Sequence, residues 1–306
     1  MSLHAAVAAV AGGLALLVAG SDRTVAAAGT LADRIGFSTF LVGVTVVAVG
    51  TSLPEIATAA YAAAYGVGSL AVGHIAGSAT AQITLGIGLV AVVASFEVAR
   101  ENVRRYGGGM LAAMTVMLVA VGSGDVSRIE GVAMAALYVG FLSRRVDAEV
   151  YVERAPGTEE TETVAHPVAW LLVGLAAVAV GGHLLVTGSR ELAATLGVSA
   201  HALGLLTGMG TTFPEVAVAL AAVRRGRGDI AGGTLLGSNI TDPLFSLGVG
   251  AAVGGITLGD PRTATLATAY MLVASAVVVA LLYRRESLTR LHGVGCILLY
   301  LPLVAV

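Results

Sequence analysis

The chain has 306 residues, of which 57% are apolar and only 12% are charged, and its mean hydropathy is +0.90. A soluble domain carries about twice this share of charged residues, so the composition excludes an ordinary water-soluble protein. The formal net charge of −2 argues against a nucleic-acid partner. Cys296 is the only cysteine, which excludes a disulfide within the chain.

Long apolar runs recur along the whole chain, and they are continuous rather than alternating. Because a chain in lipid must satisfy its own backbone groups, such runs predict membrane-spanning helices rather than barrel strands. Crossing the hydrocarbon takes about 20 helical residues. We therefore expect an all-α membrane protein with ten transmembrane helices, at residues 3–20, 37–65, 69–96, 108–122, 129–143, 167–188, 200–222, 228–257, 262–283 and 291–306.

The arginines test this count, because cytoplasmic loops are enriched in basic residues. If the N-terminus lies outside, fourteen arginines fall in inner loops and only Arg128, Arg190 and Arg262 fall in outer ones. The bias predicts a multi-pass protein of the plasma membrane with both termini outside and the loop 144–166 in the cytoplasm. That loop is too short for a folded regulatory domain, and the sequence indicates no protein partner beyond the lipid bilayer.

Two short patterns each occur twice, at an offset of 160 residues. GTSLPE at 50–55 returns as GTTFPE at 210–215, and GHIAGSATAQ at 73–82 returns as GTLLGSNITD at 233–242. Five spans per copy is an odd number, so the second copy enters the membrane from the opposite side, as in the inverted repeats of many secondary transporters.

The repeat predicts the organisation of the chain. We expect a first transmembrane repeat at 1–143, a linking loop at 144–166 and a second, inverted repeat at 167–306.

Each pattern is expected to break a long helix near the membrane midplane. Pro54 has no N–H, so the carbonyl of Gly50 loses its helical donor. Free carbonyls at membrane depth are tolerated only where they face protein, water or an ion. We expect further breaks at Gly77–Ser78 and Gly237–Ser238. Together these positions bring carbonyls, hydroxyls, an amide and carboxylates, the hard oxygen ligands that suit Na⁺ or Ca²⁺.

Glu55 and Glu215 take equivalent places in the two copies, so they are expected to meet near the midplane. A carboxylate within the membrane costs about 2.5–3.5 kcal/mol on insertion scales, and a bound cation offsets that cost. Two ionised glutamates neutralise one divalent cation. The structural alternative is a pair of acids that hydrogen-bond to neighbouring helices.

The four motifs, in matched pairs and in this order, resemble the paired alpha-repeats of the sodium/calcium exchanger family, within the calcium/cation antiporter superfamily. The resemblance covers nearly the whole chain. It implies exchange of several Na⁺ for one Ca²⁺ by alternating access, with Ca²⁺ exported and the first helix of each half sliding past a rigid core. Na⁺ and Ca²⁺ are then substrates, and no cofactor is implied.

The resemblance also implies the residues that bind the transported cations. The side chains are those of Glu55, Glu215, Asp242 and Gln82, with hydroxyl or carbonyl oxygens from Thr51, Ser52, Ser78, Thr211, Thr212 and Ser238. Backbone carbonyls flanking the site come from Ala48 and Gly208.

The second motif of the first half departs from the family, which usually has Asn at the positions of His74, Ala79 and Gln82. Gln82 still offers a carbonyl oxygen, on a longer stem, so we expect cation binding to survive. The departure leaves the selectivity and the number of Na⁺ ions open.

Several functions fit the same pattern. His74 admits H⁺ as the counter-ion, because histidine titrates near neutral pH. A K⁺-dependent exchanger is another alternative, and a cation channel is the alternative of a different class. Neither HExxH nor a Walker A motif occurs, so we expect no enzyme and no ATP-driven pump.

Overall fold

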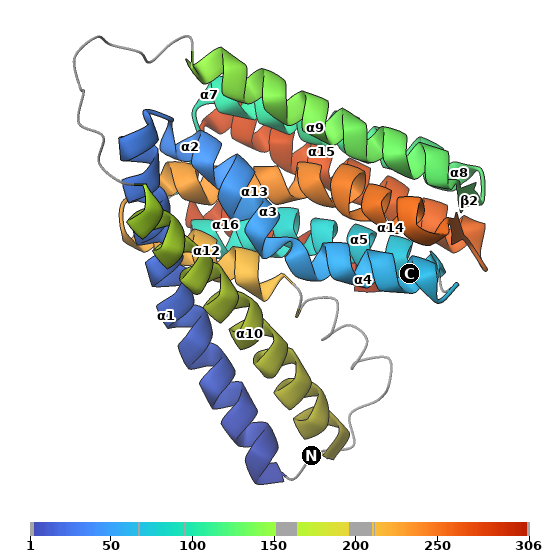
Figure 1. The fold of residues 1–306 in the computed structure, drawn as a ribbon, viewed down its shortest axis with the longest axis horizontal. Helices are drawn as coiled ribbons and strands as arrows, with labels where there is room; N and C mark the ends of the chain where they lie inside the picture. Colours follow the sequence, from blue (N-terminus) through green and yellow to red (C-terminus); the bar gives the residue numbers. More distant parts are fainter. Residues whose placement is uncertain are drawn as a thin grey trace.

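The structure is a computed structural model that describes residues 3–66, 68–94, 96–150, 164–195, 210 and 212–304. It is nearly all helical, as the continuous apolar runs predict (Figure 1). The helices before residue 151 are α1 (Leu3–Ile35), α2 (Thr39–Val42), α3 (Ala48–Thr51), α4 (Leu53–Ala64), α5 (Gly68–Ala81), α6 (Ile87–Val93), α7 (Arg100–Asn102), α8 (Gly108–Gly122) and α9 (Arg128–Val150). Those that follow are α10 (Ala165–Thr195), α12 (Phe213–Arg224), α13 (Gly228–Thr241), α14 (Leu247–Gly254), α15 (Pro261–Arg285), α16 (Arg290–Leu298) and α17 (Leu301–Val304).

In the part of the chain that the structure describes, four π-helical turns lie inside longer helices and four two-residue strands lie in the loops. The π-helical turns are η1 (Gly43–Val47), η2 (Gln82–Gly86), η3 (Val103–Gly107) and η4 (Asp242–Ser246). The strands are β1 (Phe96–Glu97), β2 (Asp125–Val126), β3 (Ile256–Thr257) and β4 (Ser287–Leu288). β1 pairs with β4 and β2 with β3, both antiparallel, so each ladder ties a loop of the N-terminal half to one of the C-terminal half.

Among the described residues, length and composition identify five helices that could cross a membrane, and the bent pair Thr39–Thr51 and Leu53–Ala64 makes a sixth. The five are Leu3–Ile35, Gly68–Val93, Arg100–Gly122, Ala165–Leu184 and Pro261–Arg285. Of the other expected spans, those at 129–143, 228–257 and 291–306 are also largely helical, whereas 200–222 falls partly outside the described residues. The count of ten stays a prediction.

The first helix is longer than predicted. It was expected to end at residue 20, but α1 continues to Ile35 through a segment that carries Asp22, Arg23 and Arg34. The charged side chains do not stop the helix, because the opposite face, with Thr24, Val25 and Ala28 among others, is buried.

α1 and α10 form an antiparallel pair, set at an angle to the other helices (Figure 1). Glycines allow their backbones to approach closely. An added Cβ at Gly20 would lie 2.9 Å from the backbone nitrogen of Val178, and one at Gly181 would lie 2.8 Å from the carbonyl oxygen of Gly13. These two helices therefore form a unit distinct from the remaining stack.

The expected break at the first motif is confirmed. Ser52 leaves helical geometry with φ −80° and ψ 3°, and the chain bends by 44° between α3 and α4. The expected breaks at Gly77–Ser78 and Gly237–Ser238 are wrong, because α5 and α13 run through both positions. Each helix instead changes to a π-helical turn directly after the motif, at Gln82 and at Asp242. Such a turn inserts one residue into the helical ladder.

The interior of the molecule is built around α13, in which every residue from Ile230 to Thr241 is buried. Its glycines face the backbone of the first half. An added Cβ at Gly237 would lie 2.7 Å from Cα of Val44 and 2.8 Å from Cβ of Ala48. This close approach brings the first motif of one half against the second motif of the other.

Candidate ion-binding site

The polar residues of the motifs converge in this interior. The α3–α4 bend supplies Thr51, Ser52 and Glu55, and α5 with η2 supplies Ser78 and Gln82. α12 supplies Glu215, with Thr212 at its N-cap, and α13 with η4 supplies Ser238 and Asp242. All of these side chains are buried, as is Ala48. Thr211 and Gly208 lie outside the described residues.

A chain of hydrogen bonds joins the two halves. The hydroxyl of Ser78 donates to Oε1 of Glu55 at 3.1 Å. The amide Nε2 of Gln82 donates to Oγ of Ser78 at 3.3 Å and to Oδ2 of Asp242 at 3.1 Å. Gln82 and Asp242 are 160 residues apart, which is the offset between the repeated motifs. Equivalent positions of the two copies are therefore in direct contact.

The carbonyl oxygen of Gln82, which we expect to bind the cation, accepts a hydrogen bond from Nδ2 of Asn239 at 3.0 Å. The role of Gln82 as a ligand stays a prediction. Asn239 also donates to the carbonyl of Leu235 at 2.8 Å, and Ser246 donates to Oδ1 of Asp242 at 3.2 Å.

The prediction of the site missed Asn239 and Ser246. The sequence did contain a signal for both: Asn239 stands where the first copy has Ala79, and Ser246 lies one helical turn after Asp242.

The hydroxyls divide into two groups. Thr51 donates to the carbonyls of Val47 at 3.1 Å and Ala48 at 3.2 Å, so it bonds to the preceding turn, as threonine commonly does in helices. The carbonyl of Ala48 also accepts from the backbone N–H of Ser52. In contrast, the buried hydroxyls of Ser52 and Ser238 have no hydrogen bond of standard geometry to a described residue, although Ser52 lies close to the carboxylate of Asp242. These two oxygens are available to a ligand.

Glu215 is the most exceptional residue of the site. Its side chain is fully buried, and neither carboxylate oxygen has hydrogen-bond geometry to any described residue, although the hydroxyl of Thr51 is nearby. The neighbouring charges, Glu55 and Asp242, are also acidic. An ionised carboxylate without a partner in a low-dielectric interior costs several kcal/mol, so this position requires a cation or a proton.

The acids alone do not form a metal cluster. Within the described part of the chain, no three acidic, histidine or cysteine residues are grouped closely enough to hold a metal ion. A cation beside Glu215 would therefore need oxygens of other kinds, such as the hydroxyls of Ser52 and Ser238. A mixed set of oxygen ligands is typical of sites for Na⁺ and Ca²⁺.

Known proteins resemble this chain along nearly its whole length. The family described as sodium/calcium exchanger protein matches residues 5–146 and 166–306. The inner membrane protein YrbG of Escherichia coli K12 is 35% identical over 304 residues, covering 94% of this chain and 91% of YrbG. The sodium/calcium exchanger MaX1 of Methanosarcina acetivorans is 25% identical over 336 residues and covers 96% of each protein.

The fold is also that of a known exchanger. A structure of the sodium-calcium exchanger NCX_Mj, soaked with 10 mM Na⁺ and zero Ca²⁺, matches with a TM-score of 0.85 at 28% identity and covers 99% of both chains. Another, soaked with 10 mM Na⁺ and 10 mM Sr²⁺, matches with a TM-score of 0.83.

The fold and the site define a helical membrane protein with a buried, acidic, oxygen-rich centre. The match to both parts of the chain then identifies it more closely: the chain belongs to the sodium/calcium exchanger family. This confirms the resemblance carried by the four motifs and places the protein among the membrane antiporters.

Proposed function

We propose that this chain is a secondary antiporter of the plasma membrane that exports Ca²⁺ in exchange for Na⁺ by alternating access. Its architecture is then ten transmembrane helices, arranged as two inverted five-helix repeats with both termini outside. The observation that carries the proposal is the buried carboxylate of Glu215, which has acidic neighbours and no hydrogen bond of standard geometry to a described residue.

Charge balance explains why such a site suits exchange. Glu55 and Glu215 together carry two negative charges, which one Ca²⁺ or two Na⁺ ions neutralise. A filled site is then close to neutral and can be enclosed by apolar helices, whereas an empty site is charged and resists enclosure. The remaining oxygen ligands in this proposal come from Thr51, Ser52, Ser78, Thr212 and Ser238. Thr211 and Gly208 are further candidate ligands.

The α1–α10 pair supports alternating access. The two helices contact each other along a glycine-rich seam and lie at an angle to the stack that holds the motifs (Figure 1). Because this close backbone contact joins α1 to α10, the pair can move as one rigid body while α13 and the helices packed against it stay fixed. The pair is thus the element that would open the site to one side and then to the other.

A second candidate is exchange of the divalent cation for H⁺. One observation favours it: Nε2 of His74 is buried without a hydrogen-bond partner among the described residues. His74 lies on α5, one helical turn before Ser78, so a proton held there would be close to the site.

Radiolabelled Ca²⁺ uptake into proteoliposomes tests both candidates. Vesicles loaded with Na⁺ are compared with vesicles that carry a pH gradient and no Na⁺, and Glu55→Gln serves as the inactive control. Uptake that needs the Na⁺ gradient and disappears in the variant supports Na⁺/Ca²⁺ exchange. Uptake under the pH gradient alone supports the H⁺-coupled candidate, and uptake under neither gradient refutes Ca²⁺ as the substrate.

A further inference from the structure

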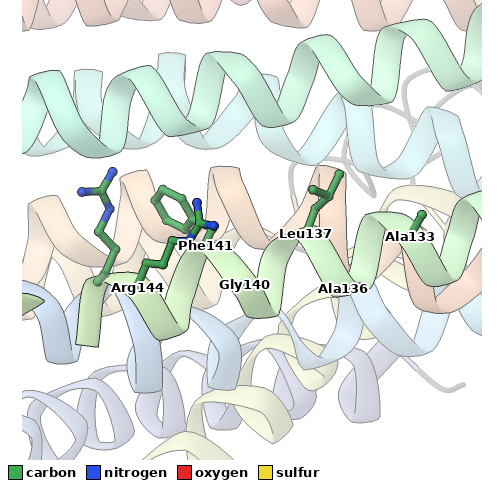
Figure 2. Close-up of a pocket in the computed structure, with 7 residues that line it drawn as sticks. Ala133, Ala136, Leu137, Gly140, Phe141 and Arg144 are labelled. Carbon is green, nitrogen blue, oxygen red and sulfur yellow. The ribbon is translucent and has the colours of Figure 1, made fainter. Parts of the chain in front are cut away.

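A groove runs along one face of α9, away from the polar residues of the motifs. Its volume is about 780 Å³, and it is lined by Ala133, Ala136, Leu137, Gly140, Phe141, Arg144 and Arg145. Figure 2 shows Leu137, Phe141 and Arg144 projecting from the same side of the helix. An added Cβ at Gly140 would meet no described atom within 4 Å, so the floor of the groove is open there.

Another face of α9 packs against the core of the molecule. Met134 and Tyr138 are buried on it, and the hydroxyl of Tyr138 accepts a hydrogen bond from Thr241 at 3.0 Å. By contrast, Leu137 is 54% exposed and Val139 is 56% exposed, although both are apolar. Exposed apolar surface of this kind marks contact with a membrane. The groove therefore opens toward the acyl chains of the bilayer.

The groove has the length of one membrane leaflet. From Ala133 to Arg144 the chain advances by eleven residues, which is about 16 Å along an α-helix. The hydrocarbon core of a bilayer is about 30 Å thick, so the groove spans about half of it. The acyl chain of a phospholipid extends from the headgroup to the midplane, and it is the apolar group that fits this length.

Charge begins at one end of the groove. Residues 131–143 are uncharged, and Arg144 and Arg145 come next. Two acids, Asp147 and Glu149, follow beyond them. The distribution of arginines among the loops predicts that this end of α9 lies on the cytoplasmic side. The two arginines therefore stand at the edge of the apolar segment, at the depth of the phospholipid headgroups.

Arg145 is held in place by aromatic rings. Its guanidinium lies 5.0 Å from the ring centroid of Phe141 and 5.6 Å from that of Tyr106. Both rings are packed in turn: the ring of Tyr106 lies 4.9 Å from that of Phe40, and an added Cβ at Gly109 would lie 2.9 Å from Cε2 of Phe141. The positive charge is therefore positioned before a ligand arrives, which lowers the entropic cost of binding one.

The charge of Arg145 is not neutralised by the described side chains. Its Nε is buried without a hydrogen-bond partner, and neither Arg144 nor Arg145 forms an ion pair with a side chain that the structure describes. A buried N–H without an acceptor costs free energy, and a phosphate group matches the planar donors of a guanidinium. A phosphate at this end of the groove would therefore be stabilised.

We propose that this groove binds one anionic phospholipid of the cytoplasmic leaflet, with an acyl chain along α9 and its phosphate on Arg145. Phosphatidylcholine fits less well, because its positive choline group would be repelled by Arg144. Phosphatidylglycerol carries the same phosphate without a positive charge. This inference does not depend on which ions the protein exchanges.

Native mass spectrometry of the protein released from nanodiscs tests the proposal. The nanodiscs contain equal amounts of phosphatidylcholine and phosphatidylglycerol, and the mass of each complex identifies the lipid that it retains. The wild type should retain one phosphatidylglycerol in preference to phosphatidylcholine. Arg145→Gln should lower that preference by about fivefold, which is the contribution of one basic residue to the attraction of anionic lipid.

Gly140→Leu tests the groove without changing its charge. The new side chain should fill the groove, whereas its Cβ meets no described atom within 4 Å, and leucine has a higher helix propensity than glycine. The variant should therefore have a thermal midpoint at least as high as that of the wild type and should retain less phosphatidylglycerol. This combination separates the loss of an acyl-chain contact from a defect in folding.

Arg284→Gln is the matched control for the loss of a positive charge. Arg284 lies in the last turn of α15, outside the groove and on the same predicted side of the membrane, so this variant should keep the wild-type preference. An equal preference in Arg145→Gln, or full retention of the lipid by Gly140→Leu, would overturn the proposal. Displacement of the lipid by inorganic phosphate would instead indicate a site for a free anion, and a dimer without retained lipid would indicate that a second copy covers the groove; either result would also overturn it.

Discussion

Gly237→Ala probes the contact that brings the two motifs together. The added Cβ would lie 2.7 Å from Cα of Val44, 2.8 Å from its carbonyl oxygen and 2.8 Å from Cβ of Ala48. Optimal carbon–carbon contacts lie at about 3.5–4.0 Å, so α13 and the η1–α3 segment must separate by about 1 Å. Overpacking of this kind costs about 1–3 kcal/mol, and the gain in helix propensity offsets up to about 1 kcal/mol.

The expected net loss is therefore about 1 kcal/mol in the free energy of unfolding, seen as a lower thermal midpoint in detergent. Gly295→Ala is the matched control, because an added Cβ there meets no described atom within 4 Å. That variant should be as stable as the wild type or more stable. Separation of the helices also moves Ser238 on α13 away from Ala48 on α3, and Na⁺-driven Ca²⁺ uptake should fall by about tenfold or more. If Gly237→Ala unfolds at the same temperature as Gly295→Ala and transports normally, α13 and the η1–α3 segment do not pack as closely as these distances require.

Three further predictions concern charged residues. Glu215→Gln should raise the thermal midpoint in cation-free buffer, because it removes a buried carboxylate that lacks partners. The variant should no longer be stabilised by Ca²⁺. If Ca²⁺ still raised its midpoint, Glu215 would not be a ligand of the cation. Asp22→Asn breaks a half-exposed ion pair with Nε of Arg225 at 3.1 Å, so the free energy of unfolding should fall by less than about 1 kcal/mol, and a larger loss would show a structural role. The side-chain and backbone hydrogen bonds from Thr263 hold the pKa of Asp260 below its ordinary value. Their stabilisation is present above the unfolded pKa of about 3.9 and is lost as the pH falls through the lower folded pKa. Thermal midpoints between neutral pH and about pH 3 should therefore fall less in Asp260→Asn than in the wild type, and equal losses would refute this role.

The bend at the first motif was predictable because its cause is local. Pro54 lacks an N–H wherever the rest of the chain lies, and the helix leaves its regular geometry two residues earlier, at Ser52. The second motif offered such a signal only in its second copy, where Pro243 follows Asp242 inside η4, and none in the first copy. Gly77 and Gly237 are compatible with a continuous helix, and the change to π-helical geometry at Gln82 and Asp242 was not encoded in any hydrophobic period.

Hydropathy alone did not predict where α1 ends. Charged residues from Asp22 onward end the apolar run, which is why the predicted span stopped at residue 20. The structure shows one face of the same segment buried, with Thr24 donating to the carbonyl of Gly20 at 2.8 Å. Burial against neighbouring helices therefore extends the helix beyond the point where the sequence becomes charged.

The sequence by itself determined the class of protein, the repeated motifs and the two membrane glutamates, because these follow from composition, from self-similarity and from the cost of a charge in lipid. Only the tertiary structure decided which hydrogen bonds the polar atoms of these motifs form. The amide of Gln82 is oriented by Asn239 and Asp242, which lie 157 and 160 residues away along the chain. A hydrogen bond depends on where donor and acceptor meet in space, and that meeting exists only once α5 and α13 have packed together.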